Sequence, residues 1–520
     1  MEVLLADYDS SYSNSAFASR SHKSAFGSFH PNVVTIRLDF PRGSWLKPWE
    51  IERFLKDNKD EDVRARKAIE SFAYFHELRH FHDYFGTFAG INLFVNFLQI
   101  VREFAALSDA IRSVGLTWEL PITRWAQRPD CPEPIRLFVH KYRVMSFARD
   151  VFLGRLLIAV EEGTTDDVWR TVSAPEIGME FPVFASLARR INHETGKHHD
   201  VTVWQPLGFE ALVEGTAQAL QRTYLEGFWP ESVVDTAWKL LMEFTGQSEF
   251  HVPKTALPYN LTDLLVSKFA RQRGRPVWER DSLLKLTDNA LMQSRLQLNA
   301  TDVPSPIPDR KATNIEVVSR HPGAVFVGAM ESADWALNKP VAALELSSEW
   351  LKSIRDSFAD CEHPKQAVAD PDASAIDVVE AFVRHEIIVP LLEVRVRYGA
   401  DVFCNTANYF SHRKEFPEPI ITSHHNDFET AKGVDDRILK KWAEFCLMAN
   451  AMEQLLDGKE VIACPRAYSL IPAFEFFQMA EGGCTKHIQG RTCQTWTLGM
   501  LSSLPNCGFR NVVRTIALEN

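Results

Sequence analysis

Over much of the chain, apolar residues recur three or four positions apart, which is the spacing of one face of an α-helix. This pattern predicts helices at 45–57, 61–85, 90–113, 132–162, 181–195, 207–225, 232–245, 259–272, 346–358, 375–396 and 437–457. Alternating or continuous apolar runs rich in β-branched residues predict strands at 32–40, 201–204, 315–318 and 324–328. The balance of the two patterns predicts an α+β fold that is predominantly helical.

The helix predicted at 61–85 has clear boundaries and little polar surface. Asp60, Glu61 and Asp62 give it an acidic first turn, which the helix dipole favours, and Gly86 stands where a C-terminal cap is expected. Its second half is apolar on nearly every side, through Phe72, Ala73, Tyr74, Phe75, Leu78, Phe81, Tyr84 and Phe85. Such a helix is expected to be buried, so its ionisable residues need partners.

Prolines and polar runs suggest how the chain is divided. Residues 301–310 hold three prolines in alternation and are predicted to be a linker. The Ser-rich residues 1–30 are predicted to be an irregular N-terminal arm. This leaves a first region at 31–300 and a C-terminal α+β region at 311–520.

Composition and charge argue against a nucleic-acid-binding, secreted or membrane-spanning protein. The 520 residues are 45% hydrophobic and 24% charged, as in ordinary globular proteins, and the net charge of −11 argues against a nucleic-acid partner. The N-terminus lacks the cationic segment of a signal peptide. The most apolar window, 88–101, is shorter than a membrane span and is expected to be a buried helix. Eight Cys without dense spacing fit a reducing compartment, so a cytoplasmic protein without a membrane partner is expected.

The candidate chemistry lies in the helix at 61–85, where His76-Glu77-Leu78-Arg79-His80 forms an H-E-x-x-H pentapeptide. Residues four apart share one helix face, so both imidazoles can bind a single metal ion. The Glu77 carboxylate can act on a water at the metal instead of binding the metal itself. A catalytic zinc site takes three protein ligands and leaves a fourth position for water, so a third ligand is expected elsewhere in the chain.

The helix predicted at 207–225 offers two carboxylates on one face, Glu210 and Glu214. Glu214 is favoured because it is followed by the small residues of Gly215-Thr216-Ala217, which would let a second helix approach closely. A Glu in the middle of an apolar helix also needs a partner. Glu214 is therefore predicted to be the third ligand, and Glu210 remains the alternative.

An H-E-x-x-H helix followed by a helix bearing E-G-x-A at 214–217 resembles the gluzincin branch of the zincin metallopeptidases. In that family, two His and a downstream Glu bind zinc, and the Glu of H-E-x-x-H is the general base. The resemblance implies that His76, His80 and Glu214 bind one Zn²⁺ per chain, with Glu77 as the catalytic base. It also implies a zincin-like catalytic core in 31–300 that hydrolyses peptide bonds of a peptide or protein substrate. The oligomeric state stays open.

Two competing interpretations of these residues lack required parts. A di-iron carboxylate bundle needs a second E-x-x-H, which the chain does not contain, and the metzincin continuation fails after His80. A non-catalytic zincin-like scaffold, or a regulatory or interaction protein with structural histidines, remains the alternative. Glu77 argues against a scaffold, because a scaffold needs the ligands but not the base.

Other polar residues near the motif allow more than one role. Asp83 lies on the face of His76 and His80, where it can accept an imidazole N–H or pair with Arg79. His82 points away from that face, and Tyr224 is one of several candidates for stabilising an oxyanion. Three further clusters are interpreted as solvated loops or buried thiols, at 198–200, 424–427 and 464–507.

Overall fold

The computed structural model describes residues 27–38, 40, 45–155, 159–191, 198–245, 257–272, 280–304, 311–332, 348–360, 362–370, 372–423, 428–429 and 434–456. Within these residues the chain forms long helices together with three small β-sheets. The predicted fold class, predominantly helical α+β, is confirmed.

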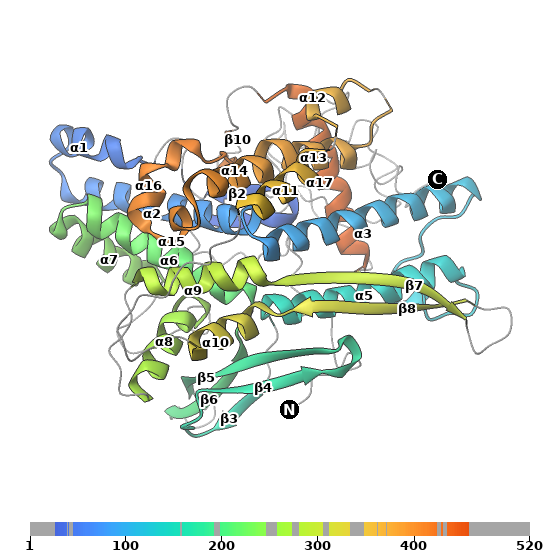
Figure 1. Cartoon of the computed structure of the whole chain (residues 1–520), viewed down its shortest axis with the longest axis horizontal. Coiled ribbons are helices and arrows are strands. Elements are labelled where there is room, and N and C mark those ends of the chain that lie inside the picture. Colours follow the sequence, from blue (N-terminus) through green and yellow to red (C-terminus); the bar gives the residue numbers. More distant parts are fainter. Residues whose placement is uncertain are drawn as a thin grey trace.

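Helix α2 (Glu61–Phe85) runs through the middle of the molecule and packs along α6 (Phe209–Phe228) (Figure 1). Helices α3 (Phe88–Ser113) and α7 (Glu231–Thr245) also pack against α2. Every residue of α2 from 71 to 85 is buried. The predicted bounds and burial of this helix are both confirmed.

The remaining helices surround this pair. They are α1 (Pro48–Asp57), α4 (Ile122–Trp125), α5 (Glu133–Leu153), α8 (Leu257–Gln272), α9 (Arg280–Gln293), α10 (Pro322–Ser332), α11 (Ser348–Ala359), α12 (Pro364–Ala367), α13 (Ala375–Val383), α14 (Val389–Tyr398), α15 (Asp401–Cys404), α16 (Thr406–Ser411) and α17 (Asp436–Leu456). In Figure 1, helices α11, α13 and α14 lie above α6, α17 runs from their level down past α3, and helices α8, α9 and α10 lie below α6.

The strands form three sheets. They are β1 (Gly27–His30), β2 (Thr35–Leu38), β3 (Ala159–Glu162), β4 (Trp169–Ala174), β5 (Met179–Ile191), β6 (His198–Pro206), β7 (Arg295–Pro304), β8 (Lys311–Arg320), β9 (Ile420–Ser423) and β10 (Phe428–Glu429). One sheet has the order β1-β2-β9-β10, the second is antiparallel with the order β3-β6-β5-β4, and the third is the β7–β8 hairpin. Strand β2 pairs with β9 in parallel, so the start of the described chain lies beside residues near 420. Strand β1, in the first sheet, packs against α2.

The two regions predicted on either side of residues 301–310 share one hydrophobic core. Buried residues of α2 and α6 belong to the same cluster as those of α13, α14 and α17. Residues 301–304 lie in β7, which pairs with β8, and 305–310 lie outside the described residues. Likewise, 1–26 of the predicted N-terminal arm lie outside them, and 27–30 form β1.

Two predicted elements have the wrong type. Residues 181–195 were expected to be helical, but 179–191 form β5, which pairs with β4 on one side and β6 on the other. Pairing along both edges outweighs the local helix preference of the Ala- and Arg-containing half of this segment. Residues 324–328 were expected to be a strand, but they lie in α10, where Phe326, Val327 and Met330 are buried. Spacings of three and four positions place Met330 on the same helix face as the other two side chains.

The helix expected at 132–162 is too long. Helix α5 ends at Leu153, because Gly154 adopts the left-handed conformation with φ of 82° that commonly terminates helices. Residues 159–162 then form β3.

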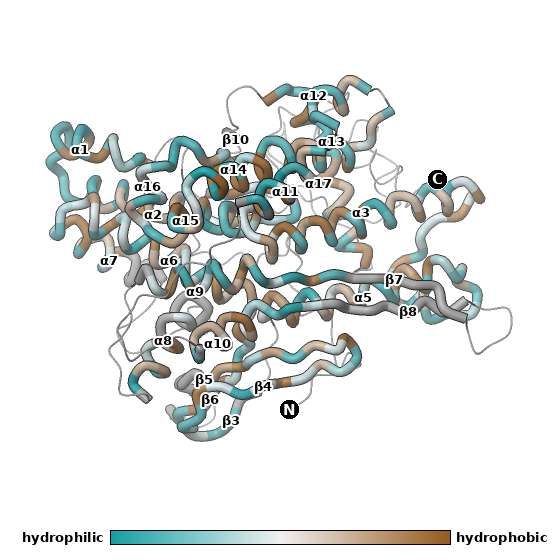
Figure 2. The backbone as a smooth tube through the Cα atoms, viewed as in Figure 1, coloured by the Kyte–Doolittle hydropathy of each residue, from teal (hydrophilic) through white to brown (hydrophobic). Residues whose placement is uncertain are grey.

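Helix α3 is long and apolar enough to cross a membrane by length and composition, and half of its most apolar window is buried in the molecule. Figure 2 shows hydrophobic and hydrophilic positions mixed along it. A single helix of this kind is weak evidence for a membrane span, because the buried core helix of a protein outside the membrane has the same length and composition.

Candidate metal centre

Helices α2 and α6 bring together the three side chains predicted from the sequence to be metal ligands. His76 and His80 lie one turn apart on α2, and Glu214 reaches them from α6. The two Nε2 atoms are 3.0 Å apart, and Glu214 Oε2 lies 3.1 Å from His76 Nε2 and 3.3 Å from His80 Nε2. The three atoms form a nearly equilateral triangle. In the described part of the chain, no other group of His, Cys, Asp or Glu converges in this way.

The second nitrogen of the His76 ring, Nδ1, has a hydrogen-bond partner outside the triangle. His76 Nδ1 lies 3.1 Å from the side-chain carbonyl oxygen of Gln221. A carbonyl oxygen only accepts hydrogen bonds, so this contact fits the tautomer with the proton on Nδ1, which leaves the Nε2 lone pair available to a metal ion. In that tautomer the lone pair would face the carboxylate of Glu214. Electron-rich atoms at this distance repel each other unless a proton or a cation lies between them.

Burial leaves the three ligands differently exposed. The side chains of His76 and His80 are 8% and 9% exposed, whereas that of Glu214 is 21% exposed. The carboxylate is therefore the side of the triangle nearest to solvent.

The electrostatics of these three side chains also favour positive charge at the triangle. Burial works to lower the pKa of His80, but the charge of Glu214 and the hydrogen bond to it outweigh burial and raise this pKa to about 9. Burial works to raise the pKa of Glu214, yet the charge of His80 and its hydrogen bond to the carboxylate hold this pKa well below its usual value.

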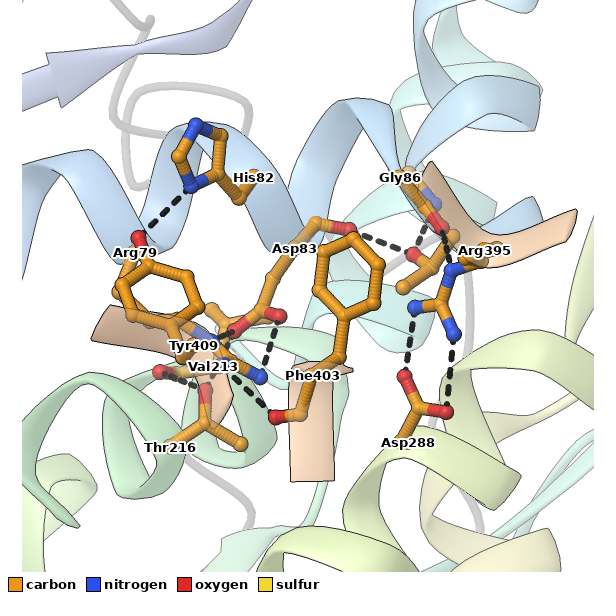
Figure 3. A network of polar contacts seen from close by, with 12 residues as sticks. Arg79, His82, Asp83, Gly86, Val213, Thr216, Asp288, Arg395, Phe403 and Tyr409 are labelled. Atoms are coloured by element: carbon orange, nitrogen blue, oxygen red, sulfur yellow. Dashed lines mark hydrogen bonds and ion pairs between the residues drawn. The ribbon is translucent and has the colours of Figure 1, made fainter. Parts of the chain in front are cut away.

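A buried ion pair on α2 locks the two helices in register. Arg79 Nε donates to Asp83 Oδ2 at 2.9 Å, and Arg79 Nη2 lies 2.9 Å from Asp83 Oδ1 (Figure 3). The Thr216 hydroxyl of α6 donates to the same carboxylate, and Arg79 Nη1 donates to the backbone oxygen of Phe403 at 2.9 Å. Of the two roles open to Asp83, the structure places it with Arg79. Because Asp83 is three residues from His80 and Thr216 two residues from Glu214, this contact fixes the spacing of the ligands.

The C-terminal end of α2 is held by a second buried ion pair. Arg395 of α14 contacts both carboxylate oxygens of Asp288 of α9, at 2.6 and 3.1 Å, and its Nε donates to the backbone oxygen of Gly86 at 2.8 Å (Figure 3). Its guanidinium also lies 3.9 Å from the ring centre of Phe403. The helix that carries the histidines is thus anchored to elements on both sides.

Small residues after Glu214 are used differently from what the sequence suggested. A Cβ at Gly215 would lie 2.1 Å from the Thr262 hydroxyl oxygen, so this glycine makes room for α8 rather than for α2. Thr216, the next residue, is the one that faces α2. The carboxylate reaches the histidines from a helix packed on both sides.

Glu77 lies under strand β1. A Cβ at Gly27 would come within 3.0 Å of Glu77 Cγ, and the backbone of Phe29 hydrogen-bonds the carboxylate. Burial raises the pKa of Glu77 against the opposing charges of His76 and His80. A buried carboxylate with a raised pKa is a stronger proton acceptor than an exposed one.

A cavity of 240 Å³ opens beside the triangle. Its lining includes Glu77, His80 and Glu214 together with Tyr84, Arg149, Arg155 and Glu210. Tyr84 follows His80 by one helical turn, so the sequence predicts that it lies on the same face of α2 as His76 and His80. Arg149, near the end of α5, carried no sequence signal, since nothing in its surroundings relates α5 to the motif.

The other residues weighed in the sequence have different partners. Glu210 pairs with Arg155, and the Tyr224 hydroxyl donates to the backbone oxygen of Leu46 at 2.8 Å. His82 Nδ1 lies 2.7 Å from the hydroxyl of Tyr409 (Figure 3). Residues 198–200 lie in β6, whereas the clusters at 424–427 and 464–507 lie outside the described residues.

In comparisons with known proteins, no family model, no curated protein and no solved structure matched the chain.

Proposed function

We propose that the protein is a zinc-dependent metallohydrolase that cleaves peptide bonds. The observation that carries the proposal is the triangle of His76 Nε2, His80 Nε2 and Glu214 Oε2, with Glu77 lining the same cavity. Two imidazoles and one carboxylate are a ligand set of catalytic zinc sites, which keep one position open.

The size of the triangle supports zinc. In a tetrahedral site with bonds of about 2.0–2.1 Å, neighbouring ligand atoms are about 3.3–3.4 Å apart. The three separations here are 3.0, 3.1 and 3.3 Å, so a small outward movement of the ligand atoms would accommodate the ion. The Gln221 contact to His76 Nδ1 orients the ring with its Nε2 lone pair toward the site, as ligand histidines require.

The chain's own residues supply the proton transfers. A bound zinc ion would acidify a water molecule and polarise a carbonyl group. Glu77 accepts a proton from the attacking water and then donates it to the leaving amine. Tyr84, one turn beyond His80, lines the same cavity, and its hydroxyl would donate a hydrogen bond to the developing oxyanion. The preference for peptide bonds rests on the resemblance to gluzincins.

Metal content tests the site directly. Protein purified without chelator is expected to contain about one zinc per chain by elemental analysis. A His76→Ala/His80→Ala variant is expected to contain almost none, while a His363→Ala/His412→Ala variant, which removes two histidines that are not part of the cluster, keeps it. Native protein that lacks zinc and does not bind added zinc would refute the metal site.

A Glu77→Gln variant tests the chemistry separately. It is expected to retain zinc and to lose cleavage of casein or of a peptide library by about 100-fold or more, since a general base contributes about 10²–10⁴-fold. Cleavage at the wild-type rate would show that Glu77 is not the base. Zinc binding by a wild-type protein with no cleavage of any peptide would favour the non-catalytic scaffold.

A further inference from the structure

Glu77 is enclosed, although the proposed reaction needs both water and substrate beside it. The residue is 8% exposed. Strand β1 lies over it, since a Cβ at Gly27 would come within 3.0 Å of Glu77 Cγ and the Phe29 N–H donates to the carboxylate. Access of a substrate to this carboxylate therefore depends on the position of β1.

The segment over Glu77 consists of β1 and the 3₁₀ helix η3 (Pro31–Val33), and we call these residues, 27–33, the cover. Its residues that line the cavity beside the triangle are Gly27, Ser28, Phe29, Pro31 and Asn32. The cavity volume of 240 Å³ is below that of pockets for drug-sized ligands, about 300–1,000 Å³. A peptide with a residue on each side of the scissile bond is no smaller than such a ligand, so the cover in this position leaves too little room for the substrate.

Strand β1 lies at the edge of its sheet. The strand order is β1-β2-β9-β10, so within the described residues β1 pairs with a strand on one side only. On the other elements it is held by packing: the Phe29 ring contacts Phe81, Tyr84 and Phe85 of α2, with ring centres 5.7–6.2 Å apart. A short edge strand is the kind of element that opens locally while the rest of a protein stays folded.

A buried hydrogen bond connects the cover to the C-terminal region. Asn32 Nδ2 donates to Glu453 Oε1 of α17 at 2.8 Å, and both residues are buried. Strand β2, which follows the cover, pairs with β9 of the same region. The closed position of the cover therefore depends on α17 and β9 as well as on α2.

The joint between the cover and β2 is strained. Val34, the first residue after η3, has φ of 59° and ψ of 35°, in the left-handed region. A valine rarely adopts this conformation because its branched side chain is crowded there. Within the described residues, Val34 is the one residue other than glycine with positive φ. A return of Val34 to the extended region would relieve the strain and change the direction of the cover relative to β2.

We propose that residues 27–33 are a movable cover, closed over Glu77 in this structure, which lifts about Val34 to admit a peptide. The Asn32–Glu453 hydrogen bond holds the closed state, so α17 controls access to the site. Lifting separates β1 from β2 and uncovers the carboxylate. The inference rests on the proposed function for the reaction that the cover controls, but movement of the cover requires neither metal nor cleavage.

Hydrogen exchange of backbone amides, followed by mass spectrometry, tests the movement without a substrate. In the wild-type protein, the amides of β1 are expected to exchange at least about tenfold faster than those of β9, because the cover opens while the rest of the sheet stays paired. Strand β9 is the comparison because it lies on the other side of β2. Equal exchange in β1 and β9 would overturn the inference.

An Asn32→Ala variant tests the hydrogen bond to α17. Loss of this buried bond is expected to speed exchange in β1 by about 5- to 100-fold and to leave β9 unchanged. Ser28→Ala is the matched control, because Ser28 Oγ lies 2.9 Å from His30 Nε2 and this contact is internal to the cover. The control is expected to exchange like the wild type. Equal acceleration of β1 and β9 in Asn32→Ala would show that the bond supports the whole sheet and would contradict the assigned role.

A disulfide between β1 and β2 tests whether the cover has to lift. Ser28 and Arg37 are paired across the two strands, and Cα atoms of antiparallel partners, about 4.5–5.5 Å apart, are within the range of a disulfide. The oxidised Ser28→Cys/Arg37→Cys protein is expected to keep its zinc and to lose peptide cleavage by at least about tenfold. Reduction is expected to restore cleavage to the level of the two single variants, which are treated in the same way as controls.

The outcomes separate the cover from the reaction. Cleavage by the oxidised protein at the rate of the reduced one would overturn the inference, because the substrate would then reach Glu77 with the cover closed. Absence of cleavage in every form, together with the expected exchange in β1, would contradict only the proposed function. If Asn32→Ala does not fold, the comparison of β1 with β9 in the wild type and the disulfide decide the matter.

Discussion

The contact between His76 Nδ1 and Gln221 Oε1 favours Nε2 as the nitrogen of His76 that would bind a metal ion. A Gln221→Leu variant is expected to weaken zinc binding by about 10- to 100-fold, because groups that hold ligand histidines typically contribute that much. Competition with a coloured chelator measures the affinity. Gln218→Leu, one turn earlier on α6, is the control for a general effect on the helix, and equal affinity in both variants would show that Gln221 does not orient the ring.

His321 predicts a dependence of stability on pH. Its Nε2 lies 3.0 Å from the backbone oxygen of Val151, and burial lowers its pKa from 6.5 to about 4. The unfolded chain therefore binds a proton more readily than the folded one between these values. Stability is fully present above pH 6.5 and falls as the pH drops toward 4, by up to about 3 kcal/mol.

Melting temperatures at pH 7 and pH 5 measure this effect. A His321→Leu variant is expected to be less stable at pH 7 but to lose less on acidification than the wild type. An equal loss in both proteins would mean that this histidine does not account for the acid sensitivity.

Some residues of the candidate site could be predicted from the sequence and others could not. Helical spacing placed His76 and His80 on one face, and the polar character of Glu214 within an apolar helix marked it as needing a partner; the structure brings all three together. Local periodicity carries no information about which distant elements meet. For that reason Arg149 and the pairing of Glu210 with Arg155 were not predictable.

At the scale of elements, the Arg79–Asp83 pair is expected to determine how α2 meets α6. Asp83→Ala leaves the guanidinium of Arg79 buried without its carboxylate, at a cost of about 3–5 kcal/mol in unfolding free energy. Chemical denaturation measures the loss. The control is Glu52→Ala, which removes an exposed helical pair with Lys56 and is expected to leave the denaturation midpoint unchanged.

A double variant separates charge burial from packing. An Arg79→Met/Asp83→Ala variant is expected to recover much of the stability that Asp83→Ala loses, since no charge is then left unpaired. Recovery of stability without recovery of zinc affinity would show that the pair positions the ligands. A double variant as unstable as Asp83→Ala would mean that shape, not charge, dominates.

The elements themselves were predicted unevenly, for physical reasons. Helix α2 has a capping side chain at Asp60, a continuous apolar run and Gly86 at its end, so local signals agree with its environment. In strand β5 the local sequence signals do not predict the observed structure, because this segment is a strand through its pairing with β4 and β6. In α10, burial against neighbouring elements outweighed the β-branched character of Val325 and Val327.

At the scale of the whole molecule, the shared core predicts that the first region does not fold alone. A fragment of residues 1–310 would expose apolar faces of α2 and α3 and would lack Arg395, the buried partner of Asp288. It is expected to aggregate or to melt without cooperativity, as judged by calorimetry, and co-expression with residues 311–520 is expected to restore solubility. A soluble fragment that melts cooperatively and binds zinc would instead support a division at 301–310.

The unequal exposure of the three ligands has a consequence for how a metal ion would enter and leave. Both imidazoles are held on a helix enclosed by protein, whereas the Glu214 carboxylate borders the cavity and is the most exposed of the three. Release would then begin with dissociation of the carboxylate, and the exchange rate would depend on how easily a competing ligand enters the cavity beside it. Small chelators that fit this cavity would remove the ion faster than bulky ones of equal affinity, so the dimensions of the cavity would also set the lifetime of a bound metal ion.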